Sequence, residues 1–101
     1  MWLRAAALTD LLDGQGKGVE VGERLVALFR VGDRVYATAN RCSHAGAPLS
    51  LGHLHGTEVT CGRHGWAFDV TSGASIPHNP PFDVPSYPVK IEGNDVLVEL
   101  P

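Results

Sequence analysis

Both cysteines of the chain and four of its five histidines lie within residues 40–69, and this concentration constrains the fold more than any other feature. The segment reads NRCSHAGAPLSLGHLHGTEVTCGRHGWAFD. Cys42 and His44 form a Cys-x-His pair, and Cys61 and His64 form a Cys-x-x-His pair. Since thiols and imidazoles are metal ligands, the repeated pairing predicts two loops between strands that together hold a metal centre.

Most of the remaining chain is predicted to form short strands. Residues 24–31 and 34–39 are apolar, β-branched runs joined by Gly-Asp, a pattern typical of a β-hairpin. A second hairpin is expected near the C-terminus, where Val89 and Ile91 alternate with charged residues, Gly-Asn-Asp turns the chain, and the alternation resumes at Val96. The runs TEVTC and WAFDV predict a third pair of strands, which leads into and out of the second Cys/His pair.

Only one helical turn is expected, opened by Thr9 and Asp10 and followed by a glycine-rich loop at residues 13–18. Five of the seven prolines lie between Pro77 and Pro88, which excludes a long helix in the last third of the chain. The fold class predicted from this pattern is all-β, a sandwich or barrel of short strands. The length of 101 residues indicates a single domain over residues 1–101.

Composition narrows the function. Hydrophobic residues make up 44% and charged residues 19% of the chain, as in a globular protein. The formal net charge of -3 disfavours nucleic-acid binding, which usually requires a basic surplus. No apolar run approaches the roughly 18 residues of a membrane span, and the N-terminus lacks the pattern of a secretory signal. We therefore expect a cytoplasmic protein whose cysteines are ligands or free thiols rather than a disulfide.

Three explanations of the Cys/His pairs are open at this point. The cysteines could be small buried hydrophobes beside unrelated surface histidines. The four residues could form a tetrahedral zinc site, although zinc fingers usually keep both cysteines on one loop and both histidines on the other. Alternatively, the mixed pairs could suit a centre with two different iron atoms, one held by thiolates and the other by imidazoles.

The segments CSHAGAPL and CGRHGWAF resemble the two cluster-binding boxes of the Rieske family, including the glycine after the second histidine. The resemblance implies a Rieske-type fold with one [2Fe-2S] cluster, bound within residues 40–69. Cys42 and Cys61 would hold the inner iron, and His44 and His64 the outer one. A third, proline-rich loop, here residues 76–85, would cover the cluster. The chain departs from the family pattern at Gly62, where proline is common.

The resemblance also implies a low reduction potential. High-potential Rieske proteins carry an extra cysteine in each box and two hydroxyl side chains near the cluster. The corresponding positions here are Ala47 and Arg63 for the cysteines, and Trp66 and Phe68 for the hydroxyls. Hydrogen-bond donors stabilise the reduced, more negative state of the cluster, and this chain has fewer of them. We therefore expect a reduction potential near the bottom of the Rieske range of roughly −150 to +300 mV.

A small chain of this type is similar to the Rieske ferredoxins of bacterial aromatic-oxygenase systems. The implied function is a one-electron carrier from a flavin-containing reductase to a terminal oxygenase, with no catalytic activity of its own. No Gly-x-Gly-x-x-Gly segment indicates a nucleotide site. Two other functions are open: the Rieske small subunit of a reductase, such as an assimilatory nitrite reductase, and a zinc-stabilised binding module.

The docking surface is expected around the two histidine ligands. Arg41, Arg63 and Trp66 could form a basic, aromatic patch there, or Trp66 could instead pack inward and the arginines remain solvated. The other three histidines, at positions 53, 55 and 78, are expected to be surface residues; His78, within the covering loop, is the strongest candidate for a role.

Overall fold

The computed structural model describes residues 1–42, 46–62, 65–77 and 80–101. The all-β prediction is confirmed: the described residues form eleven strands and three short 3-10 turns, with no α-helix among them. The strands are β1 (Trp2–Ala7), β2 (Gly16–Val21), β3 (Arg24–Val31), β4 (Arg34–Ala39), β5 (His53–His55), β6 (Glu58–Thr60), β7 (Ala67–Asp69), β8 (Ser75–Ile76), β9 (Ser86–Tyr87), β10 (Val89–Glu92) and β11 (Asp95–Glu99). The 3-10 turns are η1 (Leu8–Asp10), η2 (Leu49–Leu51) and η3 (Pro80–Phe82).

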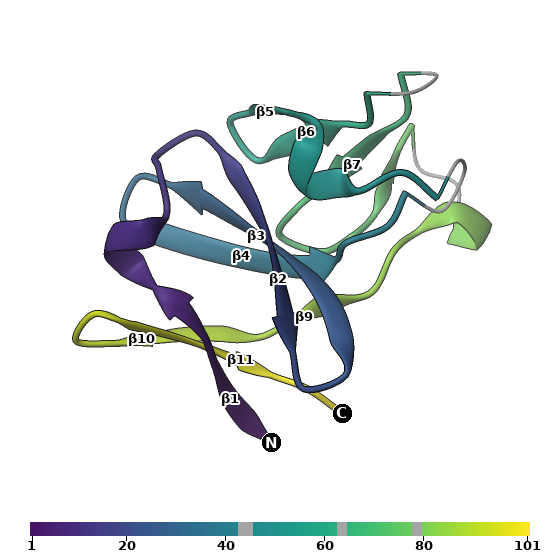
Figure 1. The fold of residues 1–101 in the computed structure, drawn as a ribbon. Coiled ribbons are helices and arrows are strands. Elements are labelled where there is room, and N and C mark those ends of the chain that lie inside the picture. Colours follow the sequence, from purple (N-terminus) through teal and green to yellow (C-terminus); the bar gives the residue numbers. More distant parts are fainter. Residues whose placement is uncertain (43–45, 63–64, 78–79) are drawn as a thin grey trace.

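The strands form three antiparallel sheets (Figure 1). Sheet A has the order β1-β11-β10, sheet B the order β2-β3-β4-β9, and sheet C the order β5-β6-β7-β8. Sheet A joins the two ends of the chain, because β1 pairs with β11 and Met1 exchanges backbone hydrogen bonds with Leu100. None of the helical segments within the described ranges is long and apolar enough to cross a membrane.

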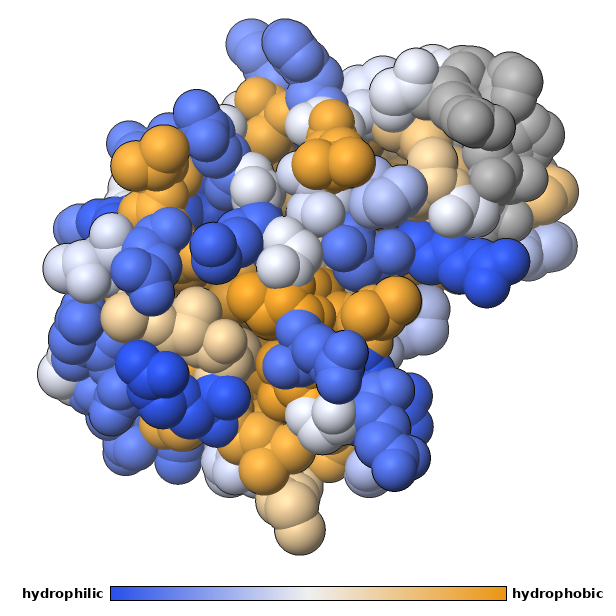
Figure 2. Space-filling model, in the orientation of Figure 1, coloured by the Kyte–Doolittle hydropathy of each residue, from blue (hydrophilic) through white to orange (hydrophobic). Residues whose placement is uncertain are grey.

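The middle of strand β3, residues 26–29, is buried on both of its faces, which explains why these four residues are all apolar. Val26 and Leu28 belong to one core cluster, which also contains Val96 and Val98 of sheet A. The alternate residues, Ala27 and Phe29, belong to a second cluster, which contains residues of sheet C. Since successive side chains of a strand point to opposite faces, sheet B separates the two cores. Figure 2 shows hydrophobic residues near the middle of one face of the molecule, surrounded by hydrophilic ones.

Each of the three predicted strand pairs is present. Strands β3 and β4 pair from Val31↔Arg34 outward, with the two-residue turn that Gly-Asp indicated. Strands β10 and β11 pair from Glu92↔Asp95, again across two residues. Strands β6 and β7 pair through Val59↔Phe68, so the second Cys/His pair lies in the connection between hydrogen-bonded strands.

Two expectations for the N-terminal third need correction. The helical turn is a 3-10 turn that begins one residue earlier than predicted, at Leu8. The glycine-rich segment is not a loop throughout, because Gly16–Val21 forms strand β2. Its glycines permit close packing: a Cβ on Gly16 would lie 2.9 Å from the Phe29 ring, and one on Gly18 would lie 2.6 Å from the Asn40 side-chain amide. These two positions therefore require glycine because neighbouring atoms lie close to them, and not because the chain turns there.

Candidate metal centre

Both cysteines are buried in the same core. Cys42 is 1% and Cys61 is 2% exposed, and both belong to the cluster between sheets B and C. Neither forms a disulfide, as the sequence led us to expect. His44 and His64, the predicted imidazole ligands, lie outside the described residues, as do Arg63 and His78. The structure therefore brings together the two thiols of the predicted ligand set.

The loop that carries Cys42 is closed by two short backbone hydrogen bonds. The N–H of Cys42 donates to the carbonyl oxygen of Ala47, and the N–H of Gly46 donates to the carbonyl oxygen of Cys42, both over 2.7 Å. After Pro48 the chain enters η2, where Leu49 is fully buried in the same core as the cysteine. Both ends of the loop are thus fixed to the domain.

Asn40 attaches the base of this loop to the neighbouring segment. It follows β4, and its side-chain oxygen accepts a hydrogen bond from the N–H of Ser50 over 2.8 Å. Ser50 is 8% exposed, so an unpaired N–H at that position would be poorly hydrated. Asn40 therefore links the entry of the loop to the turn that follows its exit.

We expect Asn40→Ala to lower the free energy of unfolding by about 1–3 kcal/mol, because it leaves the Ser50 N–H without its acceptor. Denaturant unfolding followed by circular dichroism measures this. Asn94→Ala is the matched control, since Asn94 accepts a backbone bond from Thr9 that is exposed and longer, at 3.2 Å. Equal losses in the two variants would contradict the assignment.

The second loop is the connection of the β6–β7 hairpin. The N–H of Cys61 donates to the carbonyl oxygen of Trp66 over 2.6 Å, which extends the pairing of the two strands by one step. Cys61 therefore lies at the base of the loop on its incoming side, as Cys42 does in the first loop. In Figure 1 the described ends of both loops lie at the same end of the molecule.

The proline-rich segment contacts the second loop through a pair of aromatic rings. The Phe82 ring meets the Trp66 ring edge-on, with 4.7 Å between ring centroids and 62° between ring planes. Trp66 is only half exposed and packs against the same core as the cysteines. Of the two alternatives for Trp66, the structure supports inward packing.

Beyond Phe82, the segment is attached through Asp83 and Val84. Asp83 accepts two hydrogen bonds from Ser75 of β8, and the N–H of Val84 donates to the carbonyl oxygen of Gly73. The sequence predicted a covering loop over residues 76–85, but it did not predict these hydrogen bonds to Ser75 and Gly73. The signal available in the sequence was Asp83 itself, an acidic residue that stands between apolar and proline residues.

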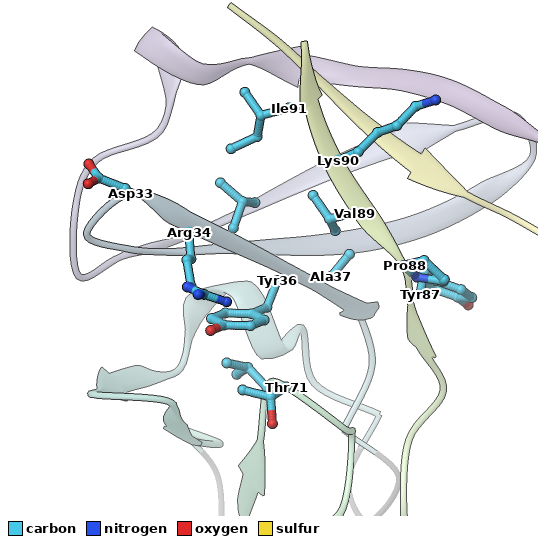
Figure 3. Close-up of a pocket in the computed structure, with 12 residues that line it drawn as sticks. Asp33, Arg34, Tyr36, Ala37, Thr71, Tyr87, Pro88, Val89, Lys90 and Ile91 are labelled. Carbon is cyan, nitrogen blue, oxygen red and sulfur yellow. The ribbon is translucent and has the colours of Figure 1, made fainter.

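A groove on sheet B is separate from the cysteines. It has a volume of about 360 Å³ and lies between β4, β10 and the turn after β7, where the Tyr36 ring lies over Thr71 (Figure 3). It contains neither cysteine nor histidine. Within the described ranges there is also no group of three or more His, Cys, Asp and Glu residues that could hold a metal ion.

The chemistry of the donors fits an iron–sulfur cluster. Two thiols that are buried, outside any disulfide and held on separate loops suit the thiolate-bound iron of a Rieske centre. The apolar side chains around them exclude water, as a cluster with a tuned potential requires.

Comparison with known proteins gives the family. Residues 1–88 match the Rieske [2Fe-2S] domain. The ferredoxin component of the naphthalene 1,2-dioxygenase system of Pseudomonas putida is 39% identical over 99 residues, which are 98% of this chain and 95% of that protein.

Two solved structures share the fold over nearly the whole chain. The ferredoxin of carbazole 1,9a-dioxygenase from Nocardioides aromaticivorans IC177 has a TM-score of 0.88 and 37% identity, covering 97% of this chain and 96% of that one. A putative NADH-dependent nitrite reductase small subunit from Mycobacterium tuberculosis has a TM-score of 0.87 and 30% identity, covering 97% and 93%. By sequence and by fold, the chain belongs to the Rieske [2Fe-2S] domain family.

Proposed function

We propose that residues 1–101 form a single Rieske domain holding one [2Fe-2S] cluster through Cys42, His44, Cys61 and His64. The observation that carries this proposal is the burial of both cysteines, which lie on separate loops, in one apolar core. The two histidines follow the cysteines by two and three residues in the sequence, and they would hold the outer iron.

The function that this centre supports is one-electron transfer from a flavin-containing reductase to a terminal oxygenase acting on aromatic compounds, in the cytoplasm. The relative in Pseudomonas putida and the structure from Nocardioides are both named as ferredoxins of dioxygenases. When bound, the cluster supplies a site that accepts and releases one electron. The chain itself is a carrier rather than an enzyme.

The described residues perform three tasks in this function. The core around Cys42 and Cys61 keeps water away from the thiolates and so limits the reorganisation that a change of charge would cause. The backbone bonds at Cys42, Gly46 and Cys61 fix both loops in place. Phe82 and the residues that follow it cover the second loop.

The docking surface for the partners includes Arg41 of the predicted patch. Arg41 is exposed and lines a groove of about 480 Å³ together with Arg24, Leu25 and Pro48. Leu25 is 65% exposed, an unusual position for a large apolar side chain. Two arginines around an apolar centre next to the first loop would suit an acidic partner surface.

The proposal is tested with the purified protein, oxidised and then reduced with dithionite. We expect a brown protein with two iron and two sulfide per chain and a rhombic Rieske-type EPR signal on reduction. With a flavin-containing reductase present, the protein should then pass electrons to a terminal oxygenase over many cycles of reduction and re-oxidation. A colourless protein with one zinc would instead establish a structural metal site.

A Rieske small subunit of a nitrite reductase is the second candidate, favoured by the likeness to the protein from Mycobacterium tuberculosis. The two functions differ in how the chain associates with its partner protein. A fixed subunit should co-purify with its large subunit in a constant ratio, whereas a ferredoxin should be stable alone and turn over several partner molecules. Size-exclusion chromatography of the natively expressed protein distinguishes them.

We expect the reduction potential to lie near the lower end of the Rieske range of roughly −150 to +300 mV. The reason is the absence of a hydroxyl on Trp66 and Phe68, where high-potential members have donors to the cluster. A spectroscopic redox titration measures it. A potential in the upper half of the range would show that other donors replace the missing hydroxyls.

A further inference from the structure

The strongest unassigned feature is a polar clamp between the covering segment and sheet C. The side-chain oxygen Oδ1 of Asp83 accepts two hydrogen bonds from Ser75, one from its N–H over 2.8 Å and one from its Oγ–H over 3.0 Å. Ser75 belongs to β8 and is 1% exposed, and Asp83 is half-buried. A carboxylate accepting two bonds from a buried residue is a specific attachment, because charge-assisted bonds are strong.

This clamp connects the covering segment to β8, which is the neighbour of the strand that leaves the second loop. Strand β8 pairs with β7, which begins at Ala67, six residues after Cys61. On either side of Asp83, Phe82 meets the Trp66 ring and Val84 donates its N–H to the carbonyl oxygen of Gly73 over 2.9 Å. Three consecutive residues thus attach to the β7–β8 hairpin and the second loop, and Asp83 makes the attachment with its side chain.

We propose that Asp83 is a positioning residue for the redox centre: by holding Ser75, it fixes the covering segment against the second loop and limits the access of water to the cluster. The inference rests on the proposed function. Water stabilises the more negative, reduced state, so a loosened cover should raise the reduction potential and should also expose the cluster to attack.

Three variants separate the contributions of hydrogen bonding and charge. Ser75→Ala removes the Oγ–H donor and leaves the Asp83 charge in place. Asp83→Asn keeps an acceptor oxygen but removes the charge, and Asp83→Ala removes both. Thr71→Ala is the matched control, because Thr71 donates its N–H and Oγ–H to Oδ1 of Asp69 over 2.9 and 2.7 Å in the same hairpin. That pair is exposed, and Thr71 lines the groove below Tyr36 (Figure 3).

The first readout is hydrogen exchange of the holoprotein, measured by mass spectrometry on peptides that contain residues 82–84. We expect exchange there to rise on the order of tenfold in Asp83→Ala, since the buried donors of Ser75 lose their acceptor. Ser75→Ala should show a smaller rise, and Thr71→Ala none. The second readout is the half-life of the visible absorption in air with a chelator, expected to shorten in the same order.

The third readout is the reduction potential. An upward shift in Ser75→Ala supports the proposal directly, because that variant keeps every charge. If Ser75→Ala and Asp83→Ala both retain the exchange, half-life and potential of the wild type, the clamp does not position the cover. Should Asp83→Ala fail to fold, Ser75→Ala decides alone. A wild-type protein without iron would instead refute the proposed function, which keeps the two failures distinct.

Discussion

Serine in place of Cys61 is expected to give a colourless protein with almost no bound iron and sulfide. Serine is nearly isosteric, and the backbone bond from residue 61 to Trp66 does not involve the side chain, so the fold should persist. A hydroxyl group is far harder to deprotonate than a thiol and is a poor ligand for iron in a cluster. Iron and sulfide assays together with EPR of the reduced protein measure the loss. Cys42→Ser should behave in the same way.

Histidine variants supply the matched control for this result. His44→Ala and His64→Ala should lose the Rieske signal, since each would remove one of the proposed ligands of the outer iron. His53→Ala and His55→Ala should keep it, because both residues are exposed on β5, where they pair with β6 rather than with a loop. A cluster that survives in Cys61→Ser with an unchanged signal would contradict the proposed ligand set.

Alanine in place of Gly73 is expected to lower the free energy of unfolding by about 2–4 kcal/mol. Gly73 has φ +81, a conformation that costs an L-residue roughly 1–2 kcal/mol. A Cβ there would also overlap the carbonyl oxygen of Val84. The covering segment would have to move, which would break the Val84 N–H bond at a further cost of about 1 kcal/mol. Denaturant unfolding of the holoprotein measures the total.

Gly56→Ala separates the two causes. Gly56 has φ +60, and no atom lies within 4 Å of the position a Cβ would take, so only the backbone cost of about 1–2 kcal/mol applies. The cluster should also be lost faster from Gly73→Ala than from Gly56→Ala, because only the former displaces the cover. Equal stability and equal cluster half-life in the two variants would show that the nearby Val84 carbonyl oxygen does not restrict which residue can stand at position 73.

Local pattern predicted the parts of the fold that depend on neighbours in sequence. The β3–β4 and β10–β11 hairpins follow from alternation and turn residues. The first has the expected Gly-Asp turn, whereas Asp95, expected in the second turn, is the first residue of β11. Long-range pairings could not be predicted in this way. The pairing of Trp2 with Glu99 joins the ends of the chain, and strands β8 and β9 have two residues each, which is too short for any periodicity.

The sequence by itself predicted the ligand set and identified the family, because Cys-x-His and Cys-x-x-His are local spacings that few other centres share. The tertiary structure alone decided which face each apolar residue buries and what holds the cover. Trp66 packs inward because Phe82 lies against it, and Asp83 is half-buried because Ser75 donates to it. Such contacts depend on segments that meet only when the three sheets assemble, and no single stretch of chain encodes them.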